Sequence, residues 1–162
     1  MAESNDTGAR INQPSYPDSQ VKPPRLLGQI DIPAVSTSVG EVRTWIRGLL
    51  SARHHMAQDD VLLLVSELVA NSVCHSDSGR QADGIVTVTV SEVDEAALRV
   101  EVTDAGSTSS APEARHAIDD SSEGGRGLFL VDAIAAKWGW RKCGIGRLTW
   151  FEVSSEADHA DQ

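Results

Sequence analysis

Three polar side chains recur every fourth residue within the most apolar stretch of this sequence. Glu67, Asn71 and His75 would place a carboxylate, an amide and an imidazole on one face of a helix. The rest of that helix would be covered by Leu63, Leu64, Leu68 and Val69. A buried polar group without a partner costs roughly 1 to 3 kcal/mol. A cleft holding a ligand against this face would explain the three side chains.

Two shorter motifs follow later in the chain. The first, Asp104-Ala105-Gly106, comes directly after an alternating segment and by itself is typical of a turn. The second is the glycine-rich loop 124–127, which precedes an apolar run with helical spacing. The N-terminus of a helix is a common place for backbone N–H groups to bind phosphate. The chain has no Walker motif and no Gly-x-Gly-x-x-Gly after its first strand, so the P-loop and Rossmann classes are excluded.

The elements that must position these motifs alternate between helical and strand periodicity. Strands are predicted over residues 27–33, 85–90, 97–103, 140–143 and 147–153, and helices over 36–57, 61–75 and 128–138. Serine or threonine at 36–38 and aspartate at 59–60 are candidate helix caps. The pattern predicts an α/β (α+β) two-layer sandwich, with a mixed, mainly antiparallel sheet carrying helices on one face. We expect a disordered tail over 1–26, a single domain over 27–153 and an acidic tail over 154–162.

Composition narrows the classes of partner. The chain has 162 residues, and 24 acidic against 14 basic residues give a net charge of −10, which argues against nucleic acid or an anionic membrane as a direct partner. No basic-then-apolar signal segment and no stretch of about 18 apolar residues is visible, so a cytoplasmic protein is expected. Cys74 and Cys143 lack metal-ligand spacing and are interpreted as reduced thiols.

Together, the motifs resemble those of the GHKL ATPases, the superfamily of gyrase, Hsp90, histidine kinases and MutL. Within it, the chain is most similar to the bacterial serine/threonine kinase-like anti-sigma factors. Residues 65–75 look like the N box, and residues 125–132 look like the second glycine box. The similarity spans about residues 27–153 and implies a Bergerat-type ATP-binding fold with ATP and Mg²⁺ as cofactors.

On the helix, the resemblance assigns three roles. Asn71 would offer a neutral oxygen to Mg²⁺, a hard cation that takes few protein ligands when it already holds nucleotide phosphates. Glu67 would be the catalytic residue that orients or deprotonates the attacking hydroxyl of a protein serine or threonine. His75 would either contact phosphate or stabilise the end of the helix.

Adenine recognition would fall to the strand ends. Asp104 would accept a hydrogen bond from the adenine amino group, and guanine presents a carbonyl at that position. Gly106 would let the chain turn close beneath the base. Thr149 stands where relatives use a threonine to support adenine through water, although an ordinary strand threonine is an equal alternative.

Phosphate binding would fall to the second glycine box. Gly125 and Gly127 would permit close approach of the phosphates, with Leu128 following at the start of the helix. Arg126 would pair with phosphate or with carboxylates of the lid, or would simply be solvated.

The function implied by this resemblance is an ATP-binding regulatory protein, an anti-sigma factor-like serine/threonine kinase that phosphorylates a small anti-sigma factor antagonist. The alternative is a nucleotide-responsive switch that sequesters a sigma factor or another regulator without phosphoryl transfer. Glu67 favours the kinase. Ser107, Thr108 and Ser109 favour the switch, because relatives often have another glycine there and a different lid hinge is therefore expected. Homodimerisation is left open.

Overall fold

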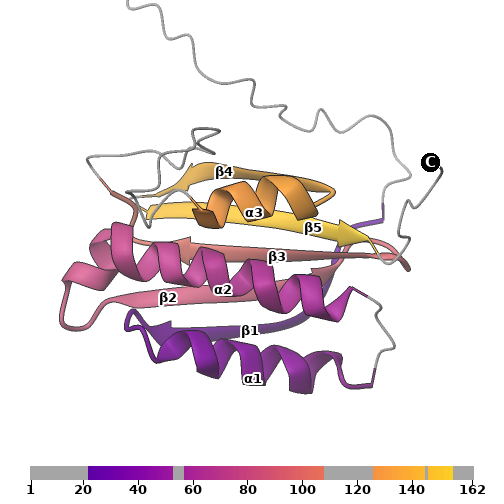
Figure 1. The fold of residues 1–162 in the computed structure, drawn as a ribbon, viewed down its shortest axis with the longest axis horizontal. Helices are drawn as coiled ribbons and strands as arrows, with labels where there is room; N and C mark the ends of the chain where they lie inside the picture. Colours follow the sequence, from indigo (N-terminus) through magenta and orange to yellow (C-terminus); the bar gives the residue numbers. More distant parts are fainter. Residues whose placement is uncertain (1–21, 53–56, 108–125, 145, 155–162) are drawn as a thin grey trace, which may run out of the picture.

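The computed structural model describes residues 22–52, 57–107, 126–144 and 146–154 (Figure 1). Its elements follow the chain in the order β1 (Arg25–Pro33), α1 (Ser38–Leu50), α2 (Gln58–His75), the short 3₁₀ helix η1 (Asp77–Arg80), β2 (Ile85–Glu92), β3 (Ala97–Asp104), α3 (Arg126–Ile134), β4 (Lys137–Cys143) and β5 (Gly146–Ser154). None of the helices in these ranges is both long enough and apolar enough to cross a membrane.

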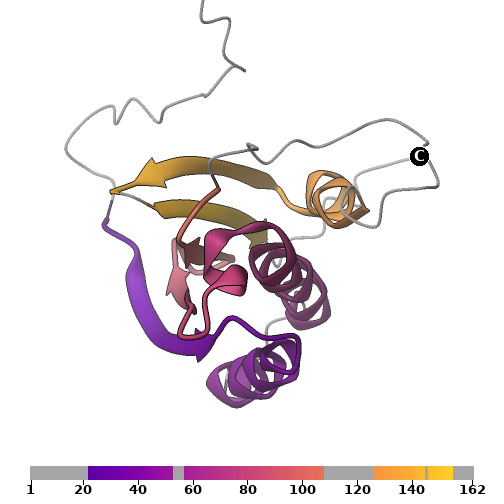
Figure 2. The same ribbon diagram turned by 90° about the vertical axis from the view of Figure 1, so that its left-hand side faces the viewer.

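The strands form one sheet in the order β1-β2-β3-β5-β4. The three α-helices lie on the same side of this curved sheet, as Figures 1 and 2 show. The predicted two-layer α+β architecture is therefore confirmed. Every pair of neighbouring strands is antiparallel within the described residues, whereas a mixed, mainly antiparallel sheet was expected.

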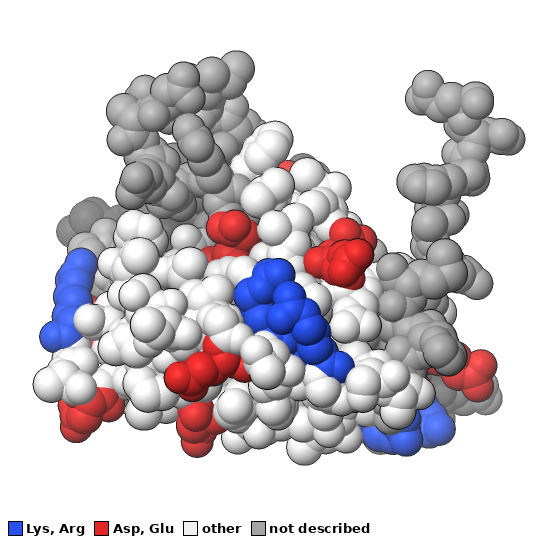
Figure 3. Space-filling model, turned by 60° about the horizontal axis from the view of Figure 1, so that its bottom comes forward, with Lys and Arg blue, Asp and Glu red and all other residues white. Residues whose placement is uncertain are grey.

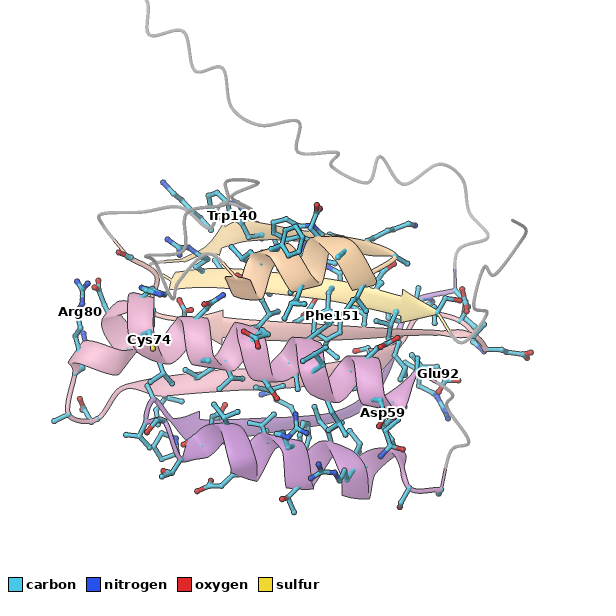
Figure 4. All side chains as sticks on the ribbon, viewed as in Figure 1. Asp59, Cys74, Arg80, Glu92, Trp140 and Phe151 are labelled. Atoms are coloured by element: carbon cyan, nitrogen blue, oxygen red, sulfur yellow. The ribbon has the colours of Figure 1, made fainter. Side chains whose placement is uncertain are left out.

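The core lies between the two layers and follows from period-two alternation in the strands. In β2 and β3 every second residue is buried, and pairs such as Val88 with Val102 and Val90 with Val100 stand opposite each other. Phe151 of β5, labelled in Figure 4, is fully buried and pairs with Val100. The helix α2 closes the core with buried residues along most of its length: Val61, Leu62, Leu64, Val65, Leu68 and Val69.

The third helix is shorter than its sequence pattern predicts. α3 ends at Ile134, and β4 begins at Lys137, so Trp138 belongs to the sheet and pairs with Phe151. Helical spacing through Trp138 competes with the alternation of Trp138 and Trp140. Pairing with β5 decides the conformation, because aromatic residues suit a half-buried strand.

The helix starts agree only in part with the expected caps. The N-cap residue of α1 is Thr37, one of the expected residues, and that of α2 is Ala57; neither makes a side-chain capping hydrogen bond. Asp59 and Asp60 instead lie in the first turn of α2, where negative charge interacts favourably with the helix dipole.

The sheet face opposite the helices is polar. Arg99 stacks on Trp150, with its guanidinium carbon 3.9 Å from the ring centroid, and it forms ion pairs with Glu101 at 2.9 Å and Glu152 at 3.0 Å. In Figure 3, which brings the α1 side of the molecule forward, acidic and basic side chains are interspersed across the described surface. The net negative charge is therefore not gathered into one patch on that side.

Candidate functional site

The sequence motifs meet at one end of the molecule. β3 runs toward the end where α2 stops, and α3 and β5 begin there (Figure 1, left). The labelled Cys74, Arg80 and Trp140 lie toward this same end in Figure 4. α2 and α3 also pack against each other. The N box, the Asp-x-Gly turn and the start of α3 therefore surround one region.

The polar stripe of α2 is available to a ligand. Glu67 and Asn71 are half-buried, and His75 is exposed at the last residue of the helix. Within the described part of the chain, these three side chains make no hydrogen bond or ion pair. The Glu67 carboxylate and the Asn71 amide therefore lie one turn apart on α2, and neither is bonded to another described residue.

Asp104 is held from both sides. Asp104 is the last residue of β3 and is only 9% exposed. The backbone N–H of Gly106 donates to Oδ1 at 2.7 Å, and the hydroxyl of Ser72 donates to Oδ2 at 2.6 Å. Gly106 has a φ of 71°, the left-handed region that favours glycine. The rotamer of Asp104 is therefore fixed by β3's own turn and by α2.

Ser72 is a residue that the sequence analysis missed. It follows Asn71 on α2 and is buried. A buried serine is uncommon, and this is the one feature that suggests a hydrogen-bonding role for Ser72. Neither periodicity nor spacing shows that its hydroxyl reaches β3, because 32 residues separate the two partners.

The turn after α2 clamps the Asp-x-Gly segment in place. The N–H of Asp77 donates to the carbonyl of Gly106 at 2.8 Å, and the N–H of Ala105 donates to the hydroxyl of buried Ser78 at 2.8 Å. This turn is tight: a Cβ atom on Gly79 would lie 1.8 Å from the carbonyl oxygen of Val73. The two motifs are consequently locked to each other.

The start of β5 completes the same face. Strand register places Arg147 opposite Asp104 and Thr149 opposite Val102, so both side chains lie on the helix-covered side of the sheet. Thr149 is 9% exposed. Trp140 pairs with Thr149 across β4 and β5, and the guanidinium carbon of Arg147 lies 5.5 Å from the Trp140 ring centroid. Neither Trp140 nor Arg147 was expected at the site from the sequence.

The glycine-rich loop is described only in part. Gly125, Thr108 and Ser109 lie outside the described residues, whereas Arg126 and Gly127 are the first two residues of α3. Leu128 is 6% exposed and belongs to the core. Any contact of Leu128 with a ligand would therefore come from its backbone.

The donor set suits a hard divalent cation bound with phosphates. The Asn71 side chain carries a neutral amide oxygen, a ligand type that Mg²⁺ accepts alongside water and phosphate oxygens. In the described ranges, no group of three or more His, Cys, Asp or Glu side chains is placed to hold a metal. Cys74 and Cys143 are both free and exposed.

Comparisons with known proteins agree with this fold. The model of the histidine kinase-like ATPase domain matches residues 32–149. No curated protein sequence matched the chain. Among solved structures, the chain is similar to the crystal structure of the RsbU and RsbW domains of Rv1364c from Mycobacterium tuberculosis, with a TM-score of 0.57 and 19% identity. That alignment covers 82% of this chain but only 32% of the other, so the chain spans about a third of that structure.

Proposed function

The chain belongs to the histidine kinase-like ATPase domain family, and we propose that it binds ATP with Mg²⁺ between α2 and α3 and acts as an anti-sigma factor-like serine/threonine kinase. Its substrate would be a small anti-sigma factor antagonist, and it would act in the cytoplasm. The observation that carries the proposal is the clamp that joins the Asp104 turn to the end of α2 inside the matched segment. The similarity to an RsbW domain supports the same fold.

The proposed site divides recognition between three elements. Asp104 accepts a hydrogen bond from the 6-amino group of adenine, with Gly106 turning beneath the base and Thr149 supporting it from β5. The backbone N–H groups at the start of α3, at Arg126, Gly127 and Leu128, hold phosphate together with Gly125. His75 either contacts phosphate or stabilises the end of α2.

Phosphoryl transfer would then need little more than positioning. Asn71 would be the protein ligand of Mg²⁺, which when bound would neutralise charge on the phosphates. Glu67, one turn before Asn71, orients the serine or threonine hydroxyl of the substrate and takes its proton. The hydroxyl oxygen forms a bond to the γ-phosphorus as the bond to the β-phosphate oxygen breaks, and ADP leaves.

The alternative is a nucleotide-responsive switch that sequesters a sigma factor or another regulator and transfers no phosphate. What favours it is the sequence after Gly106, since Ser107, Thr108 and Ser109 follow where relatives often have another glycine at the lid hinge. Both functions require ATP at the same site.

One pair of experiments separates these functions. Calorimetric titration of the wild-type protein with MgATP and MgGTP tests the nucleotide site, and failure of both to bind at millimolar concentration excludes it. Incubation with candidate antagonist proteins and MgATP, followed by intact-mass measurement, tests the kinase. A phosphate increment supports the kinase, whereas stable binding without an increment supports the switch.

A further inference from the structure

The hydroxyl of Ser72 donates a hydrogen bond to Asp104 on β3 rather than to its own helix. A serine inside a helix commonly donates to the carbonyl four residues earlier. Ser72 instead donates to Asp104 Oδ2 across the interface between α2 and β3, at 2.6 Å, and the residue is only 6% exposed. Its backbone carbonyl is occupied separately, by the N–H and the hydroxyl of Ser76. The position of the Ser72 hydroxyl is therefore set by a firmly bonded helix end.

The hydrogens in this contact can be counted. An ionised carboxylate has no hydrogen to donate, so Ser72 must supply the proton of the hydrogen bond to Oδ2. The N–H of Gly106 supplies the one to Oδ1. A serine hydroxyl has a single hydrogen, and it is used. What remains on Asp104 and on Ser72 Oγ is lone pairs alone, so the pair can only accept hydrogen bonds.

We propose that Ser72 is a positioning and specificity-determining residue. Its bond to Asp104 leaves only hydrogen-bond acceptors facing the base, so that this end of the site binds bases that present a hydrogen-bond donor. The inference rests on the proposed binding of ATP. Adenine presents a 6-amino donor to such a pair. Guanine presents a carbonyl oxygen, which would face lone pairs with no hydrogen between them, an arrangement that leaves buried acceptors unsatisfied. Ser72 acts through Asp104, by fixing its rotamer and by committing its own hydrogen.

Three ligands and two variants test this role. MgATP, MgGTP and the magnesium complex of purine riboside triphosphate, which lacks the 6-amino group, are titrated by calorimetry into wild type, Ser72→Ala and Ser66→Ala. Ser66→Ala is the matched control, because it removes a hydroxyl from the same helix that, among the described residues, bonds only to the Leu62 carbonyl and to Arg43.

Ser72→Ala should weaken MgATP binding by about 3- to 10-fold, because Asp104 loses the hydrogen bond that fixes its rotamer, an indirect loss smaller than that of a direct hydrogen bond between ligand and carboxylate. Its affinity for purine riboside triphosphate should change less than about 2-fold, because that ligand does not use the donor-accepting pair. The preference for MgATP over MgGTP should narrow, since water can enter the space left by the hydroxyl and donate to guanine. Ser66→Ala should leave the affinity for MgATP relative to MgGTP, and relative to purine riboside triphosphate, as in wild type.

The readout is the affinity for MgATP divided by the affinity for purine riboside triphosphate, because a merely structural role of Ser72 would weaken both ligands equally. Equal losses for MgATP and purine riboside triphosphate, or no loss for either, would overturn the role of Ser72. If Ser72→Ala does not fold, Ser72→Cys replaces it, since a thiol is a weak donor of similar shape. An unchanged ATP preference in that variant overturns the proposal. Absence of MgATP binding to wild type overturns the proposed function itself.

Discussion

The backbone N–H of Asp77 donates to the carbonyl of Gly106 at 2.8 Å, and this bond joins the turn after α2 to the end of β3. Ser78 reinforces the connection by accepting from the N–H of Ala105 at 2.8 Å. α2 carries the proposed Mg²⁺ ligand and base, whereas the Asp104 turn carries the proposed adenine contact. The geometry of the whole site thus depends on the close approach of two backbones.

Gly79, in the turn that carries Asp77 and Ser78, should be intolerant of substitution. In Gly79→Ala, the new Cβ would lie 1.8 Å from the carbonyl oxygen of Val73, so the backbone must shift. We expect a loss of about 1 to 3 kcal/mol in the free energy of unfolding, measured by urea denaturation, together with weaker MgATP binding. Gly40→Ala is the control, because nothing lies within 4 Å of its Cβ position on α1. That change should stabilise by up to about 1 kcal/mol. Equal stability of the two variants would contradict the clamp.

Asp104→Asn should damage base recognition more than any other conservative change. The amide keeps one oxygen that can accept, but its nitrogen cannot accept the hydrogen bond that Ser72 or Gly106 now donates to the other carboxylate oxygen. Loss of a hydrogen bond to a charged group costs about 1.5 to 3 kcal/mol, so MgATP affinity should fall roughly 10- to 150-fold by calorimetry. Asp83→Asn, at an exposed turn residue, is the control and should bind as wild type. Similar affinities for the two variants would remove Asp104 from the site.

Glu67→Ala should separate nucleotide binding from phosphoryl transfer. A positioned general base contributes about 10²- to 10⁴-fold to rate, so phosphorylation of an antagonist protein should fall by that factor. MgATP affinity should change little, because the carboxylate is proposed to contact the substrate hydroxyl. The rate is followed by intact mass of the antagonist, with Glu41→Ala on exposed α1 as control. An undiminished rate in Glu67→Ala would assign the base to another residue.

Asn71→Ala should make nucleotide affinity insensitive to magnesium. In wild type, ATP is expected to bind more tightly with Mg²⁺ than in the presence of a chelator, because Asn71 contributes an oxygen ligand to the bound ion. Removing that oxygen should bring the two affinities together. Paired titrations with Mg²⁺ and with a chelator provide the measurement. A variant that keeps the full magnesium dependence would show that Asn71 is not the ligand.

The polar face of the sheet should affect stability without affecting the site. Arg99→Ala removes a stack on Trp150 and two ion pairs in which the side chains are 15% to 28% exposed. We expect the free energy of unfolding to fall by about 1 to 2 kcal/mol, measured by urea denaturation, with MgATP affinity unchanged. Arg47→Ala, at an exposed position of α1, should change stability by no more than about 0.5 kcal/mol. A large loss of MgATP affinity in Arg99→Ala would contradict the placement of the site on the helix side.

The local hydrophobic pattern was sufficient to predict helices and strands where a segment had one consistent period. The alternation of β2 and β3, with Val88 and Val100 buried, predicted both strands, and the apolar run ending at His75 predicted α2. Residues 137–140 fitted both a helical and a strand period; the strand predicted from Trp140 is confirmed, whereas the helix predicted through Trp138 was wrong. Trp138 could cover a helix or face a strand partner, and only pairing with Phe151 settles which.

By itself, the sequence determined the elements, the family resemblance and the stripe of Glu67, Asn71 and His75, because periodicity and motif spacing are properties of neighbouring residues. Only the tertiary structure decided which residues meet across the chain. Ser72 reaches Asp104, and Arg147 stands opposite it, through strand register and the packing of α2 on the sheet. Such contacts depend on which elements become neighbours, and no local pattern encodes that choice.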